Sequence, residues 1–314
     1  MSAGMATHMS AFLSSFLLSL LLTPLAILIA RRSGLVDAPD ASSSLKIHNM
    51  PVPNSGGLAV ALSVLPTVLV FMHFNSSPIQ QVFAISGGCL LSLTLGVVDD
   101  VKGLRPLTRL FTQIALAVGL VIAGIHANLF PSGLLNAALT VLIVVGAINS
   151  INLLDGMDGL ASGVMAISCT AFALLSYVRG DSLVVALALA MVAALIGFLP
   201  YNFHPASVFL GNGGSSLLGF LLAVLITLVL SRTPTPAGLA GCLLIAGLPL
   251  IDTAYAIVRR IKAGRGLMSG DRDHFYDKLL RRGFSQRQAA FISYTAATVF
   301  AASGLAVSLL EVIP

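Results

Sequence analysis

Long runs of apolar residues, separated by short polar segments, dominate this sequence. A run of about 20 apolar residues is long enough to cross the hydrocarbon core of a bilayer as a helix. Because the runs are continuously apolar and do not alternate with polar residues, they favour helices over the strands of a membrane barrel. Ten spans are predicted, near residues 11–30, 57–74, 80–98, 107–127, 133–151, 160–178, 182–200, 214–231, 237–257 and 288–310.

The composition agrees with this pattern. The chain has 314 residues, of which 57% are hydrophobic and 9% are charged. Soluble domains carry about 25% charged residues, so a polytopic membrane protein is indicated. No polar stretch is long enough for a separate soluble domain. We therefore predict one transmembrane domain over residues 1–314, all-α, with about ten transmembrane helices.

The basic residues predict how the chain lies in the membrane. If the first helix begins outside the cytoplasm, all but two of the 17 Lys and Arg residues fall in cytoplasmic segments. The two exceptions are Arg179 and Arg232. This asymmetry follows the positive-inside rule and, with ten spans, predicts that both termini lie outside the cytoplasm. The net charge of +5 is then a topology signal, and no nucleic-acid partner is expected.

The acidic residues gather on the same predicted side as the bases. Of the 12 Asp and Glu residues, only Asp181 and Glu311 fall elsewhere. Acidic residues gain nothing from the positive-inside rule, so their position needs another cause. A polar site at the cytoplasmic face of the membrane supplies that cause.

Four polar residues follow the apolar run that ends near Ala147. Asn149, Asn152, Asp155 and Asp158 stand at every third position, so on a helix they form one slowly winding stripe. Next to a membrane span, such a stripe faces protein, water or a ligand. Carboxylate and amide oxygens suit Mg²⁺ and the phosphates that it carries. The alternative is a solvated helix end with turn residues.

Two adjacent carboxylates, Asp99 and Asp100, end the third predicted span. They repel each other, and the C-terminus of a helix already carries partial negative charge. We therefore expect a compensating cation, which could be Lys102, Arg105, Arg109 or a bound metal. The alternative is an acidic loop end.

A glycine-rich stretch, residues 211–216, opens the eighth predicted span. Glycines ahead of a helix expose backbone N–H groups where phosphate binds readily, although such a stretch alone favours neither reading. Lys46 and His48 precede a proline-rich turn before the second span, where a solvated linker is the simpler reading.

Two further features lie near the end of the chain. Asp252 falls inside the ninth predicted span, where an acid is usually paired or functional. We expect a nearby arginine as its structural partner, with direct catalysis as the second choice. The following loop contains Arg272 and His274 among other charges, and it could face lipid headgroups or bind a diphosphate or sugar.

Together these elements resemble the polyprenyl-phosphate N-acetylhexosamine-1-phosphate transferases, a family of integral membrane enzymes. The resemblance runs in order over about residues 34–287. The matching elements are Lys46 and His48 with Pro53, Gly56 and Gly57; the Asp99-Asp100 pair; Asn149, Asn152, Asp155 and Asp158; Phe209 to Ser215; Asp252 before paired arginines; and the loop of His274.

The resemblance implies a reaction and a location. It implies transfer of an N-acetylhexosamine 1-phosphate, GlcNAc-1-phosphate first, from a UDP-sugar to undecaprenyl phosphate with release of UMP. It further implies Mg²⁺, with Mn²⁺ as an alternative, at the cytoplasmic face of a bacterial inner (plasma) membrane, as the first membrane step of a cell-envelope polysaccharide such as lipopolysaccharide. A homodimer is a further expected partner arrangement, and phospho-MurNAc-pentapeptide transfer is the alternative activity.

The resemblance also implies roles for individual residues. Catalytic roles fall to Asp99, Asp100, Asp155, Asp158 and His274. Substrate-binding roles fall to Lys46, His48, Arg109, Asn149, Asn152, Gly213, Ser215 and Arg272. Metal ligation falls to Asp99, Asp100, Asp155, Asp158 and Asn212.

Two departures from the family pattern stand out. The family usually has aspartate where this chain has Asn212, so a neutral carbonyl oxygen replaces a metal-associated carboxylate. Many members carry several histidines in the late loop, whereas only His274 matches here, which disfavours the peptidoglycan branch. Two rivals remain: a secondary transporter, which would gather charges near the bilayer midplane, and an inactive scaffold homologue, which Asn212 favours.

Overall fold

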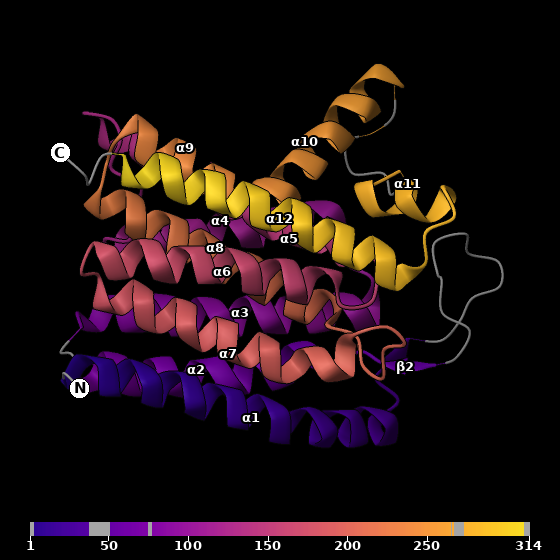
Figure 1. Ribbon diagram of the computed structural model, residues 1–314. Helices are drawn as coiled ribbons and strands as arrows, with labels where there is room; N and C mark the ends of the chain where they lie inside the picture. Colours follow the sequence, from indigo (N-terminus) through magenta and orange to yellow (C-terminus); the bar gives the residue numbers. More distant parts are fainter. Residues whose placement is uncertain (1–2, 38–50, 75–76, 265, 267–272, 311–314) are drawn as a thin grey trace.

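The computed structural model describes residues 3–37, 51–74, 77–264, 266 and 273–310. These residues form a bundle of long helices with one short antiparallel ladder (Figure 1). The helices are α1 (Ala3–Ser33), α2 (Gly56–Phe74), α3 (Ile79–Lys102), α4 (Pro106–Ile122), α5 (Gly133–Leu154), α6 (Leu160–Val178), α7 (Ser182–Asn202), α8 (Gly211–Arg232), α9 (Pro236–Ile245), α10 (Gly247–Lys262), α11 (Phe275–Arg281) and α12 (Gln286–Leu309). The strands β1 (Val36–Asp37) and β2 (Val52–Pro53) pair with each other.

The prediction of a helical, multi-pass membrane protein is confirmed. Seven helices of the described chain are long and apolar enough to cross a membrane, or up to eight if α9 and α10 count as one broken span. The count of ten is reached only by adding α2 and α4, which are apolar but shorter. The short β ladder was not predicted, because two residues per strand leave no periodicity to read.

The prediction of a continuous ninth span, 237–257, is wrong. The chain turns by 87° between α9 and α10, and α10 points away from the bundle (Figure 1). Gly247 and Pro249 stand just after the break; glycine weakens a helix, and proline cannot donate the next helical hydrogen bond. Gly247 also lies directly against the ring of Phe300 on α12, which leaves no room for a side chain there.

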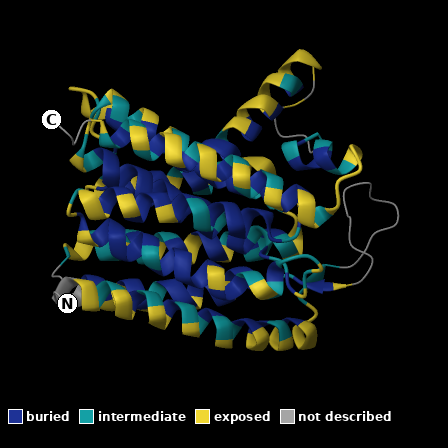
Figure 2. Cartoon of the chain, in the orientation of Figure 1, coloured by how far each residue is buried: buried dark blue, intermediate teal, exposed yellow. Residues whose placement is uncertain are grey.

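Helix α8 forms the centre of the bundle. In an apolar stretch of 18 residues within α8, 94% of the residues are buried. The corresponding share is 22% in α1 and 28% in α12. In Figure 2 the outer helices carry most of the exposed surface, as expected for helices that face lipid. A helix that is hydrophobic on all sides is stable only when it is surrounded, and α8 meets this condition. Its N-terminal residues are therefore fixed within the bundle.

Glycines let the start of α8 approach its neighbours closely. A Cβ on Gly57 of α2 would overlap the backbone of Gly214, and one on Gly96 of α3 would overlap the backbone of Asn212. Small residues at such crossings bring helix backbones together, as is common in membrane proteins. The polar ends of α3 and α8 thereby become neighbours. These ends lie with β1 and β2 at one end of the bundle (Figure 1).

The close crossing predicts a position-specific effect of adding one methyl group. Gly96→Ala should destabilise the fold by about 1–3 kcal/mol, because the opposing atoms are backbone and cannot rotate away. Gly87→Ala is the matched control in the same helix, since nothing lies within 4 Å of its Cβ position. Thermal unfolding of the purified variants in detergent measures the difference. Equal midpoints for the two variants would contradict the crossing.

Candidate active site

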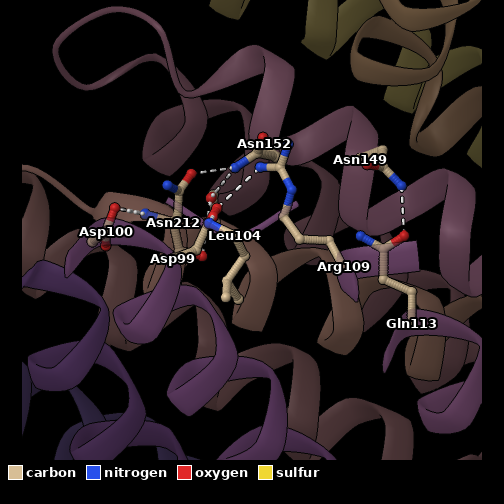
Figure 3. Close-up of polar contacts among 9 residues, drawn as sticks. Asp99, Asp100, Leu104, Arg109, Gln113, Asn149, Asn152 and Asn212 are labelled. Atoms are coloured by element: carbon tan, nitrogen blue, oxygen red, sulfur yellow. Dashed lines mark hydrogen bonds and ion pairs between the residues drawn. The ribbon is translucent and has the colours of Figure 1, made fainter. Parts of the chain in front are cut away.

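Polar side chains from α3, α4, α5 and α8 meet at one end of the bundle (Figure 3). Asp99 is buried near the end of α3, and both of its carboxylate oxygens have partners. Its Oδ1 accepts a hydrogen bond from the Leu104 amide at 2.7 Å, and its Oδ2 accepts one from Nη1 of Arg109 at 3.0 Å. Arg109 thus supplies the cation that the adjacent carboxylates were expected to need. Its side chain is 36% exposed, so part of the guanidinium faces outward.

Asp100 faces the first turn of α8. Its Oδ1 accepts a hydrogen bond from the Asn212 amide at 3.2 Å. Its Oδ2 is buried and has no hydrogen-bond partner in the described part of the chain. Gly211 makes this approach possible, because it has φ of 76° and a Cβ there would press against Asp100 and Asn54. A buried carboxylate oxygen without a partner is the kind of atom that a cation satisfies.

The two middle amides of the site pair with each other. Asn152 Nδ2 donates to Oδ1 of Asn212 at 2.7 Å and to Oγ of Ser215 at 3.1 Å. The side-chain oxygen of Asn212 is therefore already engaged by an amide. Gly213, a predicted substrate ligand, is buried and packs against Leu93 and Val97 of α3.

Asn149 lies one turn away from this pair and faces α4. Its Nδ2 donates to Oε1 of Gln113 at 2.8 Å and to the carbonyl of Val145 at 2.8 Å. A cavity of ≈10 Å³ separates these amides from Asp99 and Arg109. That is room for about one water molecule. A ligand larger than water therefore does not fit between these helices.

The remaining two acids of the stripe differ from each other. Asp158 Oδ2 accepts hydrogen bonds from the His204 ring at 2.8 Å and from the Ala206 amide at 3.1 Å, which ties the α5–α6 turn to the α7–α8 connection. The Asp155 side chain makes no hydrogen bond or ion pair with any described residue. Burial, followed by the charges of Asp100 and Asp158, raises the pKa of Asp155 well above its usual value.

His274 and Asp252 form a buried pair. Nδ1 of His274 lies 2.6 Å from Oδ2 of Asp252, and Oδ1 of Asp252 accepts from the Phe275 amide at 2.8 Å. The expectation of an arginine partner for Asp252 is therefore wrong. An arginine would have to fold back along α10, whereas the start of α11 presents both an imidazole and an amide. The His274 side chain is only 4% exposed, so in this structure it is closed to a ligand from solvent.

Helix α11 also contacts the stripe directly. The Tyr276 hydroxyl lies over Gly156, where no Cβ would fit. The ring of Tyr276 stacks on His274, with 5.8 Å between centroids. The Asp252–His274 pair thus holds α11 where Tyr276 contacts Gly156, the residue after Asp155. Lys46, His48 and Arg272 lie outside the described residues, so their predicted roles stay predictions.

Magnesium fits only part of the predicted ligand set. Among the described residues, no group of three or more His, Cys, Asp and Glu side chains is placed to hold a metal ion. Asp99 and Asp158 already have nitrogen partners, whereas among the described residues Asp100 Oδ2 has no hydrogen-bond partner and Asp155 has neither a hydrogen bond nor an ion pair. Mg²⁺ commonly binds through one or two carboxylates together with substrate phosphates and water. Asp100 and Asp155 match this mode, and a preformed protein cage does not.

Three residues of the site were missed by sequence reasoning: Asn54, Gln113 and His204. Gln113 lies within an apolar span, where an amide is expensive and therefore informative. His204 lies in the connection before the glycine-rich stretch, which carries no periodic signal. Only the fold brings it to Asp158.

Comparison with known proteins identifies the family. Residues 82–230 match the model of glycosyl transferase family 4. The chain is 33% identical over 292 residues to a probable undecaprenyl-phosphate N-acetylglucosaminyl 1-phosphate transferase of Bacillus subtilis, covering 90% of this chain and 80% of that protein. It is 32% identical over 285 residues to the decaprenyl-phosphate N-acetylglucosaminephosphotransferase of Mycolicibacterium smegmatis, covering 79% of this chain and 70% of that protein.

A third relative is more distant. The undecaprenyl-phosphate alpha-N-acetylglucosaminyl 1-phosphate transferase of Escherichia coli O157:H7 is 27% identical over 294 residues, covering 88% of this chain and 77% of that protein. This chain belongs to glycosyl transferase family 4. The resemblance read from the motifs is confirmed, and the chain is a membrane transferase of this family.

The family 4 match covers the centre of the site. It includes α3 through most of α8, and thus Asp99, Asp100, the stripe from Asn149 and Asn212. The Asp252–His274 pair lies beyond the matched residues. Within this family 4 chain, the matched helices hold the charged and amide groups, and Tyr276 of α11 contacts the α5–α6 turn at Gly156.

The raised pKa of Asp155 predicts a pH effect on stability. In the folded protein the neutral carboxyl is favoured, whereas in the unfolded chain it ionises near its usual pKa of about 3.9. Without divalent cation, the unfolding midpoint should therefore fall as pH rises from about 4 through the raised pKa. Asp155→Asn should remove this part of the slope.

Asp273 is the matched control for this pH effect. Its hydrogen bond with Arg281 lowers the pKa of Asp273, so its contribution is lost as pH falls. Asp273→Asn should therefore reduce the fall of the unfolding midpoint toward acid pH. It should leave unchanged the fall of the midpoint as pH rises toward neutral. Thermal unfolding between pH 4 and 8 in a chelator measures both. A wild-type slope that persists in Asp155→Asn would contradict the assignment.

Proposed function

We propose that this protein transfers N-acetylglucosamine 1-phosphate from UDP-GlcNAc to undecaprenyl phosphate and releases UMP. The main support is the similarity to the relative from Bacillus subtilis, which is 33% identical over 90% of this chain. That relative is named for undecaprenyl phosphate and N-acetylglucosaminyl 1-phosphate. The relatives from Mycolicibacterium and Escherichia are also named as polyprenyl-phosphate N-acetylglucosamine phosphotransferases. The gathering of carboxylates and a half-exposed arginine at one membrane end supports a substrate pair that consists of two anions.

The proposed location is the bacterial plasma membrane, with the site on the cytoplasmic side. Support comes from the described basic residues, which all lie in segments at the site end except Arg179 and Arg232. A soluble nucleotide sugar and a lipid phosphate can meet only where the membrane ends. Arg109, whose side chain is 36% exposed, provides such a place at this end of the bundle. Both chain termini would then lie outside the cytoplasm.

Asp100 and Asp155 would hold Mg²⁺, together with the substrate diphosphate. When bound, the metal neutralises the diphosphate and stabilises the charge that develops on UMP. Arg109 would bind a phosphate oxygen with the part of its guanidinium that Asp99 leaves exposed. Asp99 fixes the position of Arg109 from the buried side. Asn152 and Ser215 hold the first turn of α8 against Asp100.

The chemical step needs little help with proton transfer. An oxygen of the lipid phosphate attacks the β-phosphorus of UDP-GlcNAc, and the bond from that phosphorus to the UMP oxygen breaks. A phosphate monoester has a second pKa near ~6, so the nucleophile is already ionised at neutral pH. The protein then has to align two anions and reduce their repulsion. His274, buried against Asp252, serves this task by positioning α11 beside Asp155.

The metal assignment predicts which carboxylates are essential. Asp100→Asn and Asp155→Asn should each lower turnover by about 100-fold or more, because each removes a charge from the metal site. Asp181→Asn, at the opposite end of the bundle, is the control and should retain activity. The measurement is Mg²⁺-dependent formation of chloroform-soluble product from labelled UDP-GlcNAc and undecaprenyl phosphate. Full activity of Asp155→Asn would rule out the assignment.

Asn212 allows a second test of the metal site. Asn212→Asp should place a carboxylate next to Asp100 and lower the Mg²⁺ concentration for half-maximal activity by about tenfold. Asn149→Asp is the matched control, because Asn149 faces Gln113 and should leave the Mg²⁺ requirement unchanged. Activity that is absent in the natural protein and present only in Asn212→Asp would instead establish an inactive scaffold.

A further inference from the structure

A second charged cavity lies at the opposite end of the bundle. It has a volume of ≈420 Å³ and is formed where the α6–α7 turn meets the end of α8. Its lining includes Ser176, Arg179, Asp181, Arg232 and Thr233. None of these residues belongs to the proposed transferase site. The cavity therefore needs an explanation of its own.

The distribution of charge in the chain makes this cavity unusual. Among the Lys and Arg residues that the structure describes, Arg179 and Arg232 are the only two in segments at this end. Both line the same cavity, although the positive-inside rule disfavours basic residues on that side. Arg179 and Arg232 both depart from the positive-inside rule and both line one cavity. This coincidence indicates that the cavity itself needs positive charge.

One of the two charges is compensated and the other is not. Arg232 forms an ion pair with Asp181, whose Oδ1 also accepts a hydrogen bond from the Val184 amide at the start of α7. Arg179 has no carboxylate partner among the described residues. The described lining therefore keeps one net positive charge. A ligand with one negative charge would balance it.

Several hydrogen-bond donors of the cavity also lack acceptors. Arg179 donates through Nη2 to the Ser308 carbonyl at 2.9 Å, at the end of α12. Its Nε and Nη1 are buried without a partner in the described part of the chain. The hydroxyl of Ser176 is likewise unpartnered, and Ser176 is 1% exposed. Buried donors without acceptors destabilise a fold, so an acceptor from outside the described chain is expected.

We propose that this cavity binds a phosphate ester carrying a single negative charge. A guanidinium offers a planar set of N–H donors that matches the oxygens of a phosphate, and Ser176 adds a hydroxyl. The cavity lies where α6, α7 and α8 end, which is the depth of lipid headgroups for helices that span the bilayer. The phosphate could belong to an anionic phospholipid of the leaflet facing away from the transferase site, or to a soluble phosphate.

Hydrogen–deuterium exchange of the full-length protein in maltoside micelles tests this proposal. Three samples are compared: micelles alone, micelles with short-chain phosphatidylglycerol, and micelles with inorganic phosphate. We expect one of the additives to slow amide exchange in residues 177–184, which comprise the α6–α7 turn and the adjoining helix ends. Protection by the lipid alone identifies a headgroup, and protection by inorganic phosphate identifies a soluble ligand. No protection by either additive overturns the proposal.

Three variants separate this site from phosphate bound elsewhere. Arg179→Gln should raise the additive concentration for half-maximal protection of residues 177–184 by about tenfold or more, because a charge-assisted pair is lost. Ser176→Ala should raise it by a smaller factor, and it keeps the test valid if Arg179→Gln does not fold. Arg32→Gln, an exposed arginine at the other end, is the matched control and should change nothing. Unchanged protection in both Arg179→Gln and Ser176→Ala overturns the proposal.

The chain itself could supply a competing carboxylate. Glu311 lies outside the described residues and follows Ser308 by three positions. If it filled the cavity, residues 177–184 would be protected without additive, and Glu311→Gln would remove that protection. This result overturns the proposal. A Glu311→Gln variant that responds to additive as the natural protein does supports it.

Discussion

The contact between the end of α3 and the start of α8 determines the rest of the site. Gly96 and Gly211 let the two backbones approach until the Asn212 amide donates to Asp100. Any side chain at these glycines would push α8 outward. Because α8 is surrounded on all sides, this end of it cannot shift without disturbing the whole bundle. The position of a carboxylate at the membrane surface is thus set by close packing inside the membrane.

The same packing divides the acids into two kinds. Asp99 and Asp158 are held by nitrogen donors and act as structural ties, the first to α4 and the second to the α7–α8 connection. Within the described part of the chain, Oδ2 of Asp100 has no hydrogen-bond partner, and the Asp155 side chain makes no hydrogen bond or ion pair. Burial, and after it the negative charges of Asp100 and Asp158, raise the pKa of Asp155. The arrangement is destabilised on its own and would be relieved by a divalent cation with its phosphates.

The sequence predicted the helices well, because continuous apolar runs in a bilayer allow few other structures. The sequence also predicted that the four polar residues from Asn149 to Asp158 form one surface. Local periodicity alone could not show which neighbouring element each of them faces. Asn149 faces α4, Asn152 faces α8 and Asp158 faces His204, so neighbouring elements divide the stripe between them. The partner of Asp252 could not be predicted from the sequence either. His274 lies 22 positions away in the chain, and the two side chains meet through the tertiary arrangement of α10 and α11.

In the proposed reaction a phosphorus atom, and not the sugar alone, passes to the lipid. The most direct measurement uses UDP-GlcNAc radiolabelled at the β-phosphorus, with purified protein, Mg²⁺ and undecaprenyl phosphate. We expect the label to enter the chloroform-soluble lipid and the released nucleotide to be unlabelled UMP. Label that stays in the aqueous phase as UDP, while GlcNAc appears on the lipid, would contradict it.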